Sequence, residues 1–328
     1  MKIDSKKIRI FLQILGPVIF VYILFGIDYQ LFFKEISLLK WYFLILAIGL
    51  KIFEVVIRSL RWQTILLSLD INISRVKCVN LYWLGTFVGV ITPGRFGELI
   101  KVYFLKNKGY SSFRSFFSII LDRIVDILIL LFFSLLIFFF FLKDLGIYII
   151  SIGFFLLLVI IFIFLLIDQR SYLNKLFSRL VRKIFLIDFK DYSHFTFSKF
   201  WKGIKSLRKK EVIYFFIYLV ISWFIYFLAR YAIALSLGLN LPFIDIVIIS
   251  SSMALVAILP ISIAGLGTRE ATAIYFFSLF NLNKETALLF SLLVFTIDIL
   301  VVFFGLIPYL KENFPIKKGK SQILKQID

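Results

Sequence analysis

Long apolar runs, interrupted by a few charges and a few helix-breaking residues, dominate this chain. Apolar stretches of about 20 residues are long enough to cross the hydrocarbon core of a membrane as helices. Such runs cover about 8–27, 41–66, 113–142, 146–167, 212–237 and a last segment around Asp298. Two further apolar stretches, about 78–105 and 243–282, contain helix breakers. The pattern predicts an all-α polytopic membrane protein with about six spanning helices and two broken, re-entrant helix pairs, or eight apolar segments in total.

The two broken stretches share a design in which proline and glycine interrupt an apolar helix next to charged residues. Broken backbone in lipid leaves polar groups that protein or trapped water must satisfy. The first stretch could instead be a cytoplasmic loop between two short helices. The predicted helix breakers are Pro93, Gly94 and Gly97 in the first stretch and Pro260, Gly265 and Gly267 in the second.

Charged side chains follow each break at helical spacing. A charge at the membrane centre costs about 2.5–3.5 kcal/mol, so these residues are expected to face protein or water. Arginines would attract phosphate as planar forks, while the carboxylates would balance the site or hold a cationic headgroup or a coupling proton. A purely structural role, locking the broken helices by ion pairs, is the alternative. The candidate substrate-binding residues are Arg95, Glu98, Lys101, Asp122, Arg123, Asp126, Arg269, Glu270 and Asp298.

A second line of charges lies on the segment at 41–66. Lys51, Glu54 and Arg58 fall on one face of a helix, and the spacing of Glu54 and Arg58 allows an ion pair between consecutive turns. These charges indicate that one side of the segment faces protein.

The second half of the chain resembles the first when it is shifted by 172 residues. The shift aligns Arg58 with Arg230, Glu98 with Glu270, Tyr103 with Tyr275 and Asp126 with Asp298. We expect a single membrane domain over 1–328, with one repeat at about 41–142 and the other at about 211–311. An odd number of predicted crossings separates the repeats, so they would be inverted, as in many secondary transporters. Glu98 and Glu270 would then lie close together near the bilayer centre.

Charge sets the expected topology. The formal net charge is +19, and the positive-inside rule assigns the basic segments to the cytoplasmic side. The segment 168–210 holds twelve Lys and Arg, so it should be cytoplasmic together with both termini, and Asn240 should lie outside. The expected location is the cell membrane of a prokaryote.

Composition also limits the chemistry. Cys78 is the single cysteine and His194 the single histidine. A disulfide within the chain is therefore impossible, and we expect no metal and no cofactor. Nucleic acid is not an expected partner, because the positive-inside rule accounts for the positive charge.

Three stretches are similar to a known family. RSLRWQTILL at 58–67, YWLGTFVGVITPGRFGELIKVYFL at 82–105 with LDRIVD at 121–126, and ILPISIAGLGTREA at 258–271 resemble the membrane region of the lysylphosphatidylglycerol synthase/flippase family. The resemblance implies movement of lipid headgroups between leaflets. Larger members add a soluble domain that transfers an aminoacyl group, and we expect that domain to be absent here. By resemblance, the functional positions are Arg61, Pro93, Gly94, Gly97, Glu98, Asp122, Arg123, Pro260, Gly265, Gly267, Arg269 and Glu270.

Two functions follow as hypotheses. The first is a flippase or transporter for membrane lipid, with an anionic phospholipid or a lipid-linked headgroup as its partner and a separate synthase as the source of that lipid. The alternative is a membrane component of phospholipid aminoacylation. That reaction would need a nucleophile or base among the buried carboxylates, and the sequence offers no His, Cys or Ser triad.

Overall fold

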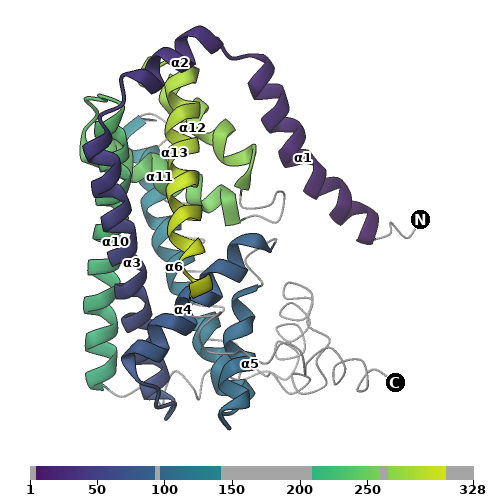
Figure 1. The fold of residues 1–328 in the computed structure, drawn as a ribbon, viewed down its shortest axis with the longest axis vertical. Coiled ribbons are helices and arrows are strands. Elements are labelled where there is room, and N and C mark those ends of the chain that lie inside the picture. The colour runs from purple at the N-terminus through teal and green to yellow at the C-terminus, as the bar shows by residue number, and fades with distance from the viewer. Residues whose placement is uncertain (1–4, 93–96, 142–208, 259–264, 308–328) are drawn as a thin grey trace.

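The computed structural model describes residues 5–92, 97–141, 209–258 and 265–307, and these residues fold into α-helices and short connections (Figure 1). Among them there is no β-strand. The helices are α1 (Ser5–Phe25), α2 (Tyr29–Ser37), α3 (Trp41–Ser68), α4 (Arg75–Ile91), α5 (Ile100–Asn107), α6 (Ser112–Phe141), α10 (Lys209–Ser236), α11 (Phe243–Ile258), α12 (Thr268–Ser278) and α13 (Lys284–Phe303).

The connection between the first two apolar runs contains a short helix, α2. Asp28 is the N-cap of α2, and its carboxylate accepts the backbone N–H groups of Gln30 and Leu31 at 2.9 and 3.2 Å. An aspartate in this position satisfies donors that have no partner within the helix. The apolar runs alone did not predict α2, because its start depends on this cap.

Two described helices, α10 and α13, are long and apolar enough to cross a membrane. Residues 15–25 of α1 form a third candidate together with α2, with a bend of 91° between them. α3 is as long as α10 but carries Lys51, Glu54, Arg58 and Arg61 along its length. The predicted number of six spans stays a prediction, and the apolar segment 146–167 and most of the basic segment 168–210 lie outside the described residues.

Both predicted helix breaks are present. The first apolar stretch divides into α4, which ends at Ile91, and α5, which begins at Ile100. The second divides into α11, which ends at Ile258, and α12, which begins at Thr268. Gly265 and Gly267 have φ angles of +78° and +83°, a region that favours glycine.

The longest contact between the two halves is the antiparallel pairing of α3 and α10, which lie side by side in Figure 1. The backbone N–H of Lys40, just before α3, donates to the carbonyl of Ser236 at the end of α10 (2.9 Å). Towards the other end of α3, the guanidinium of Arg61 lies 5.9 Å from the ring centroid of Phe215, early in α10. The start of each helix is therefore next to the end of the other.

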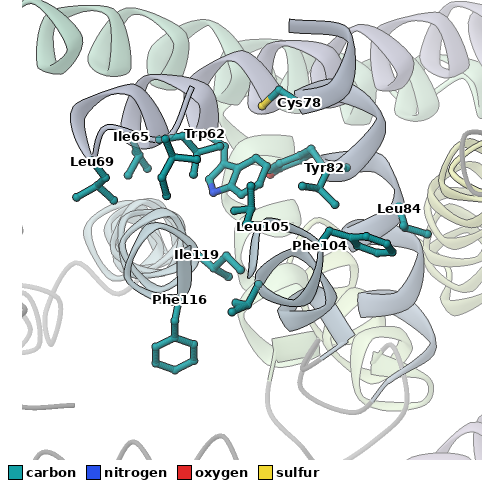
Figure 2. Packing of buried hydrophobic residues seen from close by; sticks show 14 of the residues in the cluster. Trp62, Ile65, Leu69, Cys78, Tyr82, Leu84, Phe104, Leu105, Phe116 and Ile119 are labelled. Atoms are coloured by element: carbon teal, nitrogen blue, oxygen red, sulfur yellow. The ribbon is translucent and has the colours of Figure 1, made fainter. Parts of the chain in front are cut away.

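An apolar cluster packs the helices of the first half together (Figure 2). Trp62 of α3, Tyr82 of α4, Leu105 of α5 and Phe117 of α6 are each almost fully buried in it. Four helices from both sides of the break thus meet in one core, so the short helix α5 is held by packing rather than by its own length.

A second apolar cluster packs the helices around the second break together. It joins α10, α11, α12 and α13, and it includes the rings of Phe277 and Phe290, whose centroids are 5.3 Å apart with their planes tilted by 41°. α1 reaches this region as well, because the backbone of Gly16 lies directly against Gly267.

Replacing Gly267 by alanine should destabilise the protein more than replacing Gly109. Both residues have similar φ angles, +83° and +86°, so alanine is strained at both, by about 1–2 kcal/mol. A Cβ on Gly267 would also come within 1.9 Å of the Gly16 carbonyl, whereas nothing lies within 4 Å of one on Gly109. Thermal unfolding in detergent should give the order wild type, Gly109→Ala, Gly267→Ala. Equal losses in the two variants would show that the contact between α1 and α12 contributes nothing.

Candidate functional site

The site is built around the charged face of α3. Lys51 and Arg58 both pair with Glu54, at 2.7 and 2.6 Å. The predicted pair between Glu54 and Arg58 is therefore confirmed. Arg58 also lies over the ring of Trp223 on α10, 4.8 Å from its centroid. Ion pairs on one side and aromatic rings on the other keep these charges away from lipid.

Two aspartates of α6 complete the centre of the site. Asp126 pairs with Arg58 at 3.1 Å and with Arg61 at 2.8 Å, and Arg61 also reaches Asp122 at 2.7 Å. Asp122 and Asp126 are one helical turn apart, so a single guanidinium can lie between them. The side chains of Arg61 and Asp122 are 0% and 1% exposed. Burial of this extent is costly for charges unless they are paired.

The charges of the first break join the same centre. Glu98 pairs with Lys101 at 3.1 Å and forms a close ion pair with Arg123 of α6. Arg123 also approaches Asp126 at 3.9 Å. The structure therefore brings four of the predicted residues together, and their role in substrate binding stays a prediction. Arg95, Pro93 and Gly94 lie outside the described residues.

Two glycines of α4 make room for the buried pair. A Cβ on Gly85 would lie 2.8 Å from the side chain of Lys101, and one on Gly89 would lie 2.8 Å from that of Glu98. Gly85 and Gly89 are one turn apart, so they form a smooth strip on α4 that receives both side chains. The Lys101 ammonium then lies 4.9 and 4.6 Å from the ring centroids of Trp62 and Tyr82.

One lysine connects this centre to the second half. Lys51 lies 3.2 Å from Asp298 of α13, and Asp298 also pairs with Arg230 of α10 at 2.8 Å. Asp298 was predicted as a site residue, and the structure places it with Arg230 and Lys51. Its contacts do not include Arg269 or Glu270.

Arg269 and Glu270 form a separate buried unit at the second break. One carboxylate oxygen of Glu270 accepts the backbone N–H of Gly267 at 2.6 Å, and the other accepts from Arg269 and Ser291. Arg269 also donates to Ser291 and lies over the ring of Phe295, 4.6 Å from its centroid. Glu270 thus caps the start of α12. Pro260 lies outside the described residues.

All the ion pairs described above except that of Arg269 with Glu270 form one connected set, which we call the charge network. Its cations outnumber its carboxylates by one, so with every group ionised the described part of the network carries one excess positive charge. Its cations are Lys51, Arg58, Arg61, Lys101, Arg123 and Arg230, and its carboxylates are Glu54, Glu98, Asp122, Asp126 and Asp298.

Only a few members of the charge network can be reached from outside. The side chains of Arg123 and Asp298 are 20% and 26% exposed, and those of Lys51 and Arg58 are 12% and 11% exposed. Arg123 is thus the most accessible arginine in the network, and a phosphate could bind there as to a planar fork.

Several members of the site were not among the candidates from the sequence pattern. Arg61, which links both aspartates, entered only through the family resemblance, although its one-turn spacing from Arg58 was visible. Trp223 and Ser291 carry no signal of their own in an apolar sequence, and only packing brings them to charged partners.

Comparison with known proteins identifies the family. Residues 13–305 match the family described as the lysylphosphatidylglycerol synthase TM region. The chain belongs to this family. No curated protein and no solved structure matches it. For this lysylphosphatidylglycerol synthase membrane region, the charge network is the feature that a functional hypothesis must explain.

Breaking the centre of the network should be costly. Asp126→Asn removes the partner of two buried arginines, and a broken buried pair costs about 3–5 kcal/mol. Asp70→Asn is the matched control, since Asp70 pairs with Arg114 at the surface (3.5 Å, side chains 60% and 51% exposed) and such pairs contribute less than about 1 kcal/mol. Thermal unfolding in detergent should show a large loss for the first variant and little change for the second. Equal, small changes would mean that the network does not hold the helices together.

Proposed function

We propose that this protein is a flippase that moves an anionic phospholipid, or a lipid-linked headgroup, between the leaflets of the cell membrane. The observation that carries the proposal is the charge network with its excess positive charge, buried in a protein of the lysylphosphatidylglycerol synthase membrane family. A headgroup that crosses the hydrocarbon core needs polar partners on its path, because charge is expensive there. The accessible guanidinium of Arg123 would receive the phosphate.

Six spanning helices and an inverted repeat are part of the proposal. α3 contains too many charges to qualify as a span by composition, but it lies antiparallel along α10, which qualifies. If α10 crosses the membrane, α3 must cross beside it in the opposite direction. Residues of α3 and α10 correspond at the 172-residue shift, so an antiparallel pair of these helices is what an inverted repeat requires.

Other features recur at the same shift. α6 begins at Ser112 and α13 at Lys284, and the preceding turns contain Gly109 and Asn281, both with positive φ (+86° and +55°). Arg58 pairs with Asp126 and Arg230 with Asp298, both across 68 residues. Equal turns and equal ion pairs at equal spacing support a duplicated unit.

The two broken helix pairs use different arginines to neutralise their glutamates. Glu98 pairs with Arg123 on α6. In the second half the position equivalent to Arg123 is Phe295, and Arg269, from the break itself, lies over that ring and pairs with Glu270 at 2.5 Å. The arginine has changed its place in the sequence while the carboxylate–guanidinium pair is retained. This conservation within one chain supports a role for both pairs in the shared site.

The orientation of the protein belongs to the proposal too. Both termini would be cytoplasmic in the prokaryotic cell membrane, and Asn240 would lie outside, as the distribution of basic residues predicts. The alternative function, a membrane component of phospholipid aminoacylation, would change the lipid composition of a deletion strain. A flippase would change the sidedness of a lipid at constant composition.

Two equivalent residues provide the test of the inverted repeat. Ser111 and Asn283 are 172 residues apart, both exposed, and each precedes a corresponding helix, α6 or α13. Single cysteines at these positions, in a chain with Cys78 replaced by alanine, should react with a membrane-impermeant maleimide from opposite sides. Labelling of both from one side would contradict the inverted repeat.

Removal of either glutamate charge should abolish lipid movement. In vesicles that contain a fluorescent phosphatidylglycerol, Glu98→Gln and Glu270→Gln should reduce flipping to the rate of protein-free vesicles, because each removes a buried carboxylate that pairs with an arginine of the site. Glu211→Gln makes the same chemical change in the first turn of α10 and should leave the rate unchanged.

The amount of folded protein that is recovered distinguishes a loss of flipping activity from a loss of stability in this test. Wild-type flipping per folded molecule in both glutamine variants, with less protein recovered, would assign these pairs a structural role and contradict the proposed site.

A further inference from the structure

The ion pair between Arg61 and Asp122 exists in one half of the molecule only. At the 172-residue shift, Arg61 corresponds to Ile233 and Asp122 to Val294. Ile233 and Val294 are 0% and 5% exposed and belong to one apolar cluster. The second half therefore folds with apolar side chains where the first half buries a charged pair. Since apolar replacements of a buried ion pair are often neutral or stabilising, the fold does not require these charges.

Asp122 is also the least compensated carboxylate of the charge network. Asp126 contacts three arginines, and Glu54, Glu98 and Asp298 each contact two cations. Among the described residues, Asp122 forms an ion pair with Arg61 alone, and Arg61 is shared with Asp126. Although Arg61 approaches it to 2.7 Å, neither oxygen of Asp122 accepts an aligned hydrogen bond from the part of the chain that the structure describes. A buried carboxylate in this state has unused capacity to bind a proton.

A second buried polar group without a hydrogen bond lies in the same region. The hydroxyl of Tyr82 on α4 makes no hydrogen bond with any described residue, although the side chain is 1% exposed. The carboxylate of Asp122 is the charge that acts on it most strongly. Two buried polar groups on packed helices that make no hydrogen bond among the described residues can both accept or donate to a small polar species, a proton with or without water.

We propose that Asp122 takes up and releases a proton during lipid movement; the inference rests on the proposed flippase function. The proton comes from water, forms an O–H bond with one carboxylate oxygen and returns to water when Asp122 ionises again. Arg61 keeps its pair with Asp126 at 2.8 Å throughout. The charged and titratable groups around Asp122 are Arg61 from α3, Cys78 and Tyr82 from α4, Lys101 from α5, and Arg123 and Asp126 from α6.

Protonation would couple directly to lipid binding. A neutral Asp122 adds one positive charge to a network that already carries one in excess, so an anionic headgroup binds more tightly. By linkage, a bound anionic headgroup favours protonation of Asp122 to the same extent. Proton release would then weaken the site and free the lipid.

Infrared difference spectroscopy on the purified full-length protein tests the proton site without any transport. Acid-minus-neutral spectra should contain the C=O stretch of a protonated carboxyl group that is lost in Asp122→Asn. The double variant Arg61→Ile, Asp122→Val, which copies the second half, should fold as stably as the wild type and lack the band. Asp298→Asn should keep it. A band that persists in Asp122→Asn, or is absent from the wild type, would overturn the inference.

The vesicle assay with fluorescent phosphatidylglycerol then separates the inference from the function on which it rests. Wild-type flipping should fall about tenfold per pH unit on the alkaline side, as for any step that needs one protonated group. Asp122→Asn should lose this dependence. Flipping by wild type that is independent of pH would overturn the coupling and leave the flippase standing. No flipping by wild type at any pH would overturn the proposed function, while loss of the infrared band in Asp122→Asn would still identify the titrating group.

Discussion

The structure depends on the pairing of charges within the helix bundle. α3 carries four charged residues: Glu54 pairs with Lys51 and Arg58 of the same helix, and Lys51, Arg58 and Arg61 also reach carboxylates of α13 or α6. A helix with such a face could not lie in lipid alone, since each unpaired charge would cost several kcal/mol. The antiparallel contact with α10 and the aspartates of α6 make α3 compatible with a membrane. The same ion pairs form a buried cluster of charges between these helices.

The broken helices meet the same constraint at shorter range. Where a helix stops, its backbone donors and nearby charges need partners. In the second break Glu270 supplies them by capping α12 through Gly267. In the first break the smooth strip of Gly85 and Gly89 lets Glu98 and Lys101 turn inwards. Glycine thus acts in two ways here, through its backbone freedom at Gly267 and through the missing side chain on α4.

Much of this arrangement could be predicted from the sequence because membrane burial leaves a plain signal. The apolar runs predicted the main helices, and proline and glycine predicted both breaks. The charges near the first break placed Glu98, Lys101, Arg123 and Asp126 among the candidate site residues. The pattern could not assign Asp298 to Arg230 and Lys51, because that choice depends on how the two halves pack. It also missed α2, whose helix depends on the cap by Asp28.

Two features of the site cannot be derived from a sequence pattern: the distance between Glu98 and Glu270, and the position of a bound lipid. The distance between Glu98 and Glu270 stays a prediction, since each is paired with an arginine of its own half. The position at which a lipid binds is also a prediction. An experimental structure of the protein in a nanodisc of phosphatidylglycerol addresses both at once. The proposed function predicts a lipid phosphate at the guanidinium of Arg123, between two halves of opposite orientation in the bilayer. A dry, lipid-free network between halves of the same orientation would contradict it.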